Sequence, residues 1–164
     1  MDHVNTLIGL AQISLVLTGF VAVFVAFYAG THPPSKPDIH HAFAMLMGSV
    51  VALLLTLIPI VLGGYGLSGE KLWYWASLIG APLGMLWGLS TLRMTLKLSK
   101  EEFVQAGIMH MLTAYTLGTS ATGLMLWNIF TIAGPGHYVL ATILTLMVAL
   151  IGFVSFSLQN FLKL

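Results

Sequence analysis

The six histidines are the residues of this sequence best suited to carry chemistry, because it has no cysteine and its acidic residues avoid the interiors of the long apolar runs. A neutral imidazole can ligate a transition metal or haem iron, and an ionisable side chain inside a membrane helix is a functional-site hypothesis by default. His110 lies about a turn and a half into one apolar run and is the most embedded ionisable side chain away from a run end. His41, at the start of another run, is its natural partner.

His41 and His110 are therefore the candidate ligands for a metal or haem, although the spacing between them is not diagnostic. The simpler interpretation is a pair of hydrogen-bonded histidines between helices, so we expect no cofactor and keep haem or a transition metal as the alternative. The neighbouring His40 points about 100° away from His41 on a helix, which prevents both from ligating one ion without distortion.

Recognisable catalytic motifs are missing from the sequence. It contains no HExxH, P-loop, GxSxG or acid-dyad pattern, so we name no catalytic residue and expect no enzyme activity. Cation-coupled transport usually needs a carboxylate within the membrane, and the apolar runs carry none in their interiors. The chain of 164 residues is also too short for the paired inverted repeats of typical transporters.

Five long apolar runs must position the histidines, and each has the roughly 20 residues that a helix needs to cross hydrocarbon. Hydrophobic residues make up 58% of the chain and charged residues 7%, with a mean hydropathy of +0.96. We predict an all-α fold, with residues 1–164 as one transmembrane domain. The predicted helices are 5–29, 42–63, 72–97, 105–132 and 138–162. The connections are short, and we expect the proline-rich segment Thr31–Asp38 to be a stiff loop.

The basic residues predict the orientation of the bundle. With five crossings, five of the six lie on one side, which the positive-inside rule places in the cytoplasm, and only Lys71 lies on the other. The N-terminus is then outside and the C-terminus cytoplasmic. Aromatic residues at the predicted outer ends agree with this, since such rings prefer the headgroup layer. The five basic residues are Lys36, Arg93, Lys97, Lys100 and Lys163, and the aromatic residues are Tyr65, Trp73, Trp75, Trp127 and Tyr138.

Small and weakly polar residues recur along the runs at helical spacing. Ala76, Gly80, Gly84 and Gly88 repeat every four residues and predict a face for close helix packing, either within the chain or between subunits. Other polar residues are candidates for the lining of a water-filled path. These are Gln12, Thr113, Thr116, Ser120 and Asn128.

Two stretches carry a resemblance that covers most of the chain in length and hydropathy layout. LTGFVAVFVAF (17–27) and LIPIVLGGYGLSGEKLWYWAS (57–77) resemble small, uncharacterised bacterial polytopic membrane proteins. The resemblance implies a multi-pass protein of the bacterial inner membrane, and it transfers no site residue and no substrate.

Three classes of function fit these features. We favour a small homo-oligomeric channel with an unknown permeant. Short loops, the glycine face of Ala76, Gly80, Gly84 and Gly88, and the hydroxyl residues spaced along the helices suit a conduit built from several copies. One alternative is an accessory or scaffold subunit that packs against a partner membrane protein. The other is a small haem or metal redox protein that uses His41 and His110. The expected partners are the lipid bilayer and further copies of the chain, without nucleic acid.

Overall fold

The computed structural model describes residues 3–31, 33–131 and 134–161, and within these ranges the regular structure consists of six α-helices. The helices are α1 (His3–Thr31), α2 (Lys36–Gly64), α3 (Gly69–Thr95), α4 (Lys100–Gln105), α5 (Ile108–Phe130) and α6 (Pro135–Phe161). The all-α prediction is therefore confirmed for the described residues.

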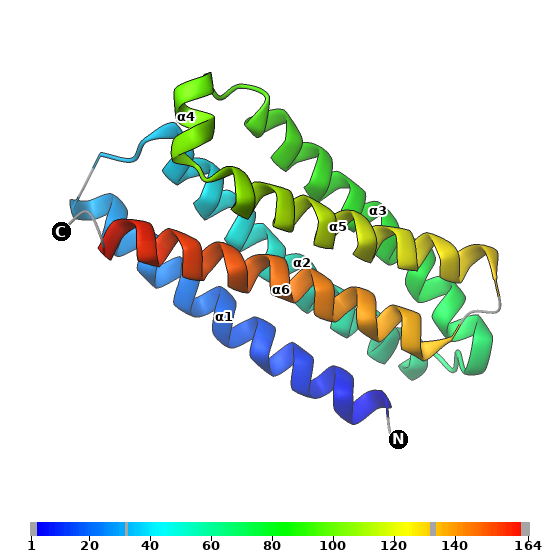
Figure 1. The fold of residues 1–164 in the computed structure, drawn as a ribbon. Coiled ribbons are helices and arrows are strands. Elements are labelled where there is room, and N and C mark those ends of the chain that lie inside the picture. The colour runs from blue at the N-terminus through cyan, green and yellow to red at the C-terminus, as the bar shows by residue number, and fades with distance from the viewer. Residues whose placement is uncertain (1–2, 32, 132–133, 162–164) are drawn as a thin grey trace.

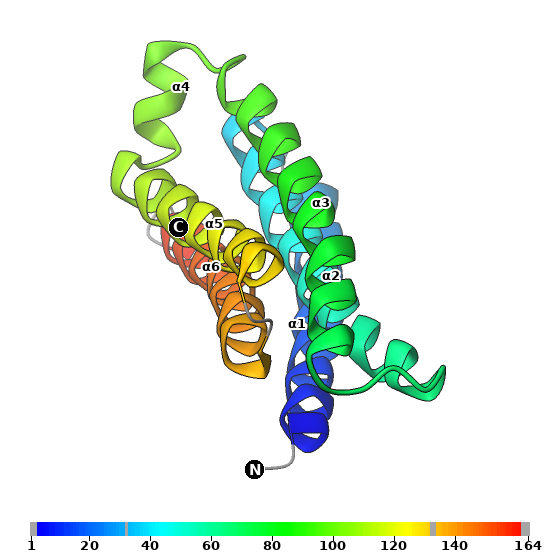
Figure 2. The ribbon, with the colours of Figure 1, turned by 90° about the vertical axis from the view of Figure 1, so that its right-hand side faces the viewer.

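Five long helices run side by side, and the short α4 connects α3 to α5 at one end of the bundle (Figure 1). Helix α2 is central because it packs against α1, α3 and α6. Helix α5 packs against both α3 and α6, and Figure 2 shows α3 and α5 diverging toward the end where α4 joins them. Helix α1 begins at the opposite end of the bundle from the one where α6 ends.

Four helices are long and apolar enough to cross a membrane, namely α1, α2, α3 and α6. Their outward side chains fit that role, since Val16, Val23 and Phe27 of α1 are 71%, 71% and 73% exposed. Such a surface is unfavourable in water and favourable against lipid. The chain therefore has the features of an integral membrane protein. The fifth predicted span, α5, is not among these four, and it carries several threonines, His110 and Asn128.

Helix α2 starts earlier than the sequence suggests, at Lys36 and not at residue 42. Ser35 and Asp38 form a capping box, in which each side chain accepts a hydrogen bond from the other residue's backbone. Pro37 is compatible with this first turn, because a residue there has no helical partner for a backbone N–H. Treating all three prolines as loop residues was therefore wrong, and the earlier start places two histidines inside the helix.

The fourth predicted helix, 105–132, begins slightly later, at Ile108, and a separate short helix precedes it. Ser99 and Glu102 form a second capping box, which starts the separate helix α4. Gly107 then adopts a φ of 85°, a conformation that glycine tolerates and other residues rarely adopt, and α5 begins after it. His110 consequently lies in the first turn of α5.

A proline inside α2 is accommodated by a tyrosine from α6. Pro59 has no N–H, so the carbonyl of Leu55 loses its usual donor four residues later. The hydroxyl of the fully buried Tyr138 donates to this carbonyl at 2.7 Å. In a membrane interior such a replacement bond is required, since water is not available to supply one.

The expected belt of aromatic residues is only partly on the surface. Tyr65, Trp75 and Trp127 are exposed, as a headgroup position requires. Trp73 and Tyr138 are instead buried against each other, with ring centroids 5.7 Å apart. These two rings belong to the core between helices, so they give no support to the predicted orientation.

Candidate functional site

Three histidines gather at the end of the bundle where α2 and α5 begin. His40 and His41 lie in the second turn of α2 and are both buried, and half-buried His110 lies in the first turn of α5. The ring centroids of His41 and His110 are 5.0 Å apart, and those of His40 and His41 are 5.8 Å apart. The structure thus brings together the two histidines that the sequence pairs and adds a third beside them.

His40 takes part in a chain of polar side chains. Its Nε2 lies 2.8 Å from Oγ1 of Thr95, and that hydroxyl lies 2.6 Å from the hydroxyl of Tyr115. When the Thr95 hydroxyl donates to the carbonyl of Thr91, at 3.1 Å, its oxygen accepts from both neighbours, and His40 then carries its proton on Nε2. When the Thr95 hydroxyl instead donates to Tyr115, the Tyr115 hydroxyl is free to donate elsewhere. This series of hydrogen-bonded side chains was not predicted from the sequence. The available signal was the pair Thr91 and Thr95, one turn apart near the end of α3.

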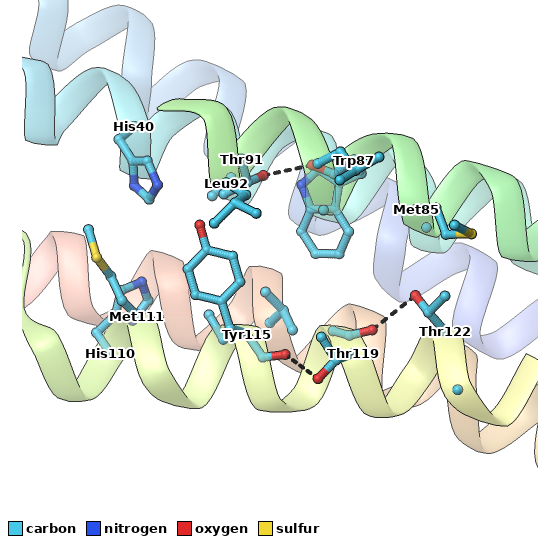
Figure 3. Close-up of a pocket in the computed structure, with 18 of the residues that line it drawn as sticks. His40, Met85, Trp87, Thr91, Leu92, His110, Met111, Tyr115, Thr119 and Thr122 are labelled. Carbon is cyan, nitrogen blue, oxygen red and sulfur yellow. Dashed lines mark hydrogen bonds between the residues drawn. The ribbon is translucent and has the colours of Figure 1, made fainter. Parts of the chain in front are cut away.

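A pocket of about 370 Å³ lies between α3 and α5, with α2 and α6 contributing to its walls. Its walls are mostly apolar. Figure 3 shows the polar rings of His40, His110 and Tyr115 toward one end, and Met85 with the hydroxyl of Thr122, which donates to the carbonyl of Gly118, toward the other. An apolar pocket with a few convergent polar groups is the usual form of a small-molecule site.

Four buried ring nitrogens around this end of the bundle find no hydrogen-bond partner among the described residues. They are Nδ1 of His40, Nε2 of His41, Nε1 of Trp87 and Nδ1 of His110. Buried polar atoms are normally hydrogen-bonded, so each exception needs a physical explanation. Because three of these residues line the pocket and the fourth adjoins His110, we identify this region as the candidate functional site.

The metal and haem alternatives can be compared with this geometry. In the part of the chain that the structure describes, no group of three or more His, Cys, Asp or Glu side chains could hold a metal ion. With metal–nitrogen bonds of about 2 Å, two imidazoles on opposite faces of a haem would have ring centroids about 6 Å apart. The observed 5.0 Å between His41 and His110 is shorter, so the arrangement suits a small ion better than a haem.

The glycine face of α3 is largely used for packing inside the chain. A Cβ on Gly80 would lie 2.7 Å from Cδ2 of Leu55 in α2, and one on Gly84 would lie 3.1 Å from Oγ1 of Thr122 in α5. Ala76 is fully buried. Gly88 is different, because a Cβ there would meet nothing within 4 Å and the residue lines the pocket.

The five candidate lining residues do not converge on one path within a single chain. Gln12 lies on α1, and Thr113, Thr116 and Ser120 lie on α5; all four are exposed. Asn128 is fully buried, and its amide nitrogen donates to Oγ of Ser77 at 3.0 Å and to the carbonyl of Gly134 at 3.2 Å. Its amide oxygen accepts from the Gly134 N–H at 2.9 Å, so Asn128 ties α3 and α5 to the turn before α6.

Charged groups near the histidine end join α2 to α4. Nζ of Lys36 lies 3.3 Å from a carboxylate oxygen of Glu102. The hydrogen bond from the Ser99 backbone N–H lowers the pKa of the Glu102 carboxyl, and Lys36 adds to this effect. The exposed ion pair contributes little to stability, but it marks where α4 meets the start of α2.

The other histidines lie away from this cluster or outside the described residues. His3 is exposed at the start of α1 and packs edge-on against Trp73, and His137 is exposed near the start of α6. His32 and Lys163 lie outside the described residues. In comparisons with protein-family models, curated proteins and solved structures, nothing matches this chain.

Proposed function

We propose that the chain is a multi-pass protein of the bacterial inner membrane in which α5 forms a fifth crossing, with the N-terminus outside and the C-terminus cytoplasmic. Helix α5 has 23 residues, and about 1.5 Å of rise per residue makes it long enough. Its hydroxyl groups support this proposal: Thr113, Thr116 and Thr122 each donate to the carbonyl four residues earlier, which reduces the cost of placing them in lipid. An odd number of crossings also agrees with the opposite ends at which α1 begins and α6 ends.

We further propose that the protein binds a lipid-soluble small molecule in the pocket between α3 and α5. The observation that carries the proposal is the distribution of groups in this pocket: the walls are mostly apolar, the hydroxyls of Thr119 and Thr122 donate to carbonyls of their own helix, and the rings of His40, His110 and Tyr115 lie together at one end. Such a pocket accommodates an apolar body and fixes the position of one polar head. This function replaces the channel as our first choice.

The polar end selects the chemical class of the ligand. When the Tyr115 hydroxyl donates to Thr95, its oxygen can still accept a hydrogen bond; when the direction is reversed, it can donate to a carbonyl. The Thr119 hydroxyl lines the pocket further along. A ring that carries carbonyl or hydroxyl oxygens, such as a quinone or quinol, fits both states of this hydroxyl.

The proposal is tested by titrating the purified protein in detergent with a short-chain ubiquinone analogue and following tryptophan fluorescence. Trp87 lies on the pocket wall, so a bound quinone should quench it. Gly88→Leu adds four carbon atoms on a pocket-lining residue. At about 0.3 kcal/mol for each ligand atom displaced, the loss is at least about 1 kcal/mol, or roughly fivefold in affinity.

Gly9→Leu is the matched control, because a Cβ on Gly9 also meets nothing within 4 Å and Gly9 does not line the pocket. Tyr115→Phe should weaken binding about fivefold, as expected for one hydrogen bond worth about 1 kcal/mol. Equal quenching in wild type and Gly88→Leu would contradict the proposal, as would equal losses in Gly88→Leu and Gly9→Leu.

A homo-oligomeric channel is the second candidate, and the exposed face of α5 favours it. Thr113, Thr116 and Ser120 lie on that face, in the long helix that is not among the four candidate membrane spans of the described residues. Packing of α5 faces from several copies would shield these hydroxyls from lipid.

The natural absence of cysteine makes a direct test of this second candidate simple. Ser120→Cys should form disulfide-linked dimers in membranes, while Leu15→Cys, on the exposed face of α1, should not. If the two variants cross-link to the same extent, α5 is not the interface. If Thr116→Phe leaves ion flux in liposomes unchanged, α5 does not line a channel.

A further inference from the structure

The backbone favours one tautomer of His41. Backbone groups of Ala106 and Pro37 lie beside its imidazole, and its Nε2 is the ring nitrogen that is buried without a partner among the described residues. Pro37 has no N–H, so its carbonyl can only accept. The proton therefore lies on Nδ1 and the lone pair on Nε2. Metal-binding histidines typically have this arrangement, because a backbone acceptor on one nitrogen fixes the ring and leaves the other free to ligate.

The neighbouring ring of His110 supplies a second nitrogen. Its Nδ1 is buried and is likewise unpartnered in the described part of the chain, and the two rings are 5.0 Å apart and inclined by 51°. With bonds of about 2 Å, two imidazoles at a tetrahedral ion would have centroids about 5 Å apart.

Met45 brings a sulfur to the same place. It follows His41 by one helical turn, so both side chains lie on one face of α2. A Cβ on Gly152 of α6 would lie 3.7 Å from Sδ of Met45 and 3.8 Å from Cε1 of His110, the atom bonded to Nδ1. The thioether sulfur and the second imidazole therefore both lie within 4 Å of one point beside Gly152, where the glycine has no side chain.

We propose that Nε2 of His41, Nδ1 of His110 and Sδ of Met45 form a binding site for a soft transition-metal ion, Cu(I). Neutral imidazoles and a thioether add no negative charge and favour monovalent copper over hard cations, which prefer oxygen ligands. Asp38, the acid closest to His41 in the sequence, is already engaged in the capping box with Ser35. The site shares His110 with the pocket between α3 and α5, whereas His41 and Met45 do not line that pocket, so His41→Ala and Met45→Leu test the copper site separately from the pocket proposal.

The test is a Cu(I) titration of the full chain in detergent, in competition with a coloured Cu(I) chelator. We expect one equivalent per chain, and a loss of affinity of at least about 100-fold in His41→Ala and in His110→Ala, since even partners outside the first ligand shell are worth about 10–100-fold. Met45→Leu conserves volume and should fold normally, yet it should lower the affinity at least about tenfold. X-ray absorption of the copper-loaded protein should show sulfur scattering that Met45→Leu removes.

His137→Ala is the control, because this histidine is exposed and lies on α6, away from the cluster. It should bind copper like the wild type. One equivalent that persists unchanged in His110→Ala would overturn the proposal, as would a wild type that takes up no copper. Unchanged binding in Met45→Leu would overturn the proposed ligand set, and tighter binding of Zn²⁺ than of Cu(I) would overturn the assignment of the ion.

Discussion

Tyr138→Phe tests how the bundle tolerates a proline in its central helix. The substitution removes one oxygen and leaves the ring, which is fully buried and packs against Trp73. The lost hydroxyl donates at 2.7 Å to the carbonyl of Leu55, whose usual helical donor is missing because residue 59 is proline. Packing is therefore unchanged, and one carbonyl inside the bundle loses its donor.

The size of the effect follows from this single bond. Hydrogen bonds between membrane helices average about 0.6 kcal/mol and reach about 1.7 kcal/mol, while a buried acceptor left without a donor costs about 1–3 kcal/mol. For a fully buried pair we expect Tyr138→Phe to lower the free energy of unfolding by about 1–2 kcal/mol. The assay is reversible unfolding in mixed detergent and SDS micelles, followed by circular dichroism.

Pro59→Ala provides the control that separates this explanation from a general loss of packing. Alanine restores an N–H at position 59, which can bond the Leu55 carbonyl in the ordinary helical manner. In this background the further change Tyr138→Phe should cost less than about 0.5 kcal/mol, because the two sites are coupled through one acceptor. Equal costs in the two backgrounds, or a cost below about 0.3 kcal/mol in the wild-type background, would refute the reasoning.

Three further predictions concern the packing of a glycine, the hydrogen bonds of Asn128 and the effect of pH on α4. Gly80→Ala should lower the free energy of unfolding by about 1–3 kcal/mol, because its Cβ would lie 2.7 Å from a methyl carbon of Leu55. Gly88→Ala should not lower it, because a Cβ there meets nothing within 4 Å. Unfolding of both variants in SDS checks this. Asn128→Ala removes three hydrogen bonds and should cost about 2 kcal/mol in the same assay, at about 0.6 kcal/mol each, and a neutral result would contradict a structural role. Because the pKa of Glu102 is lowered, its ionised carboxylate stabilises the start of α4 at pH values above its ordinary pKa of 4.5. This stabilisation is lost as the pH falls through the lowered pKa. Hydrogen exchange of residues 100–105, corrected for intrinsic rates, should therefore speed up in acid; Glu102→Gln should remove this response, and Glu101→Gln should keep it.

The sequence predicts the helices well because each apolar run exceeds the length needed to cross a membrane, and length and hydropathy are local properties. It also pairs His41 with His110 correctly, since both lie near the same end of their runs and short connections place those ends together. The exact helix starts were missed where local geometry decides them. Pro37 was assigned to a loop although it fits a first turn, and the positive φ at Gly107 has no signature beyond the glycine itself.

The pocket and the polar chain could not be predicted, because they depend on how three helices are rotated against one another. Thr95 and Tyr115 are 20 residues apart, and their hydrogen bond needs α3 and α5 to face each other at one height. Helical periodicity gives the face of each helix but not its partner. For the same reason the exposed threonines of α5 resemble a pore lining in the sequence, although in one chain they point away from the other helices.

Glycines in this bundle serve separate purposes that a single repeating pattern conceals. Gly80 allows α2 and α3 to approach closely, and Gly88, two turns later on the same helix, leaves open space in the pocket. Gly48 and Gly152 accommodate larger neighbours, since a Cβ there would lie 2.9 Å from the indole of Trp87 and 2.8 Å from Cγ of Met45. Substitutions at Gly80 and Gly152 should therefore lower stability, and those at Gly152 should also disturb metal binding through Met45, while those at Gly88 should act on ligand binding. The pattern of glycines marks where the helices leave space, and the neighbouring side chains determine what that space can hold.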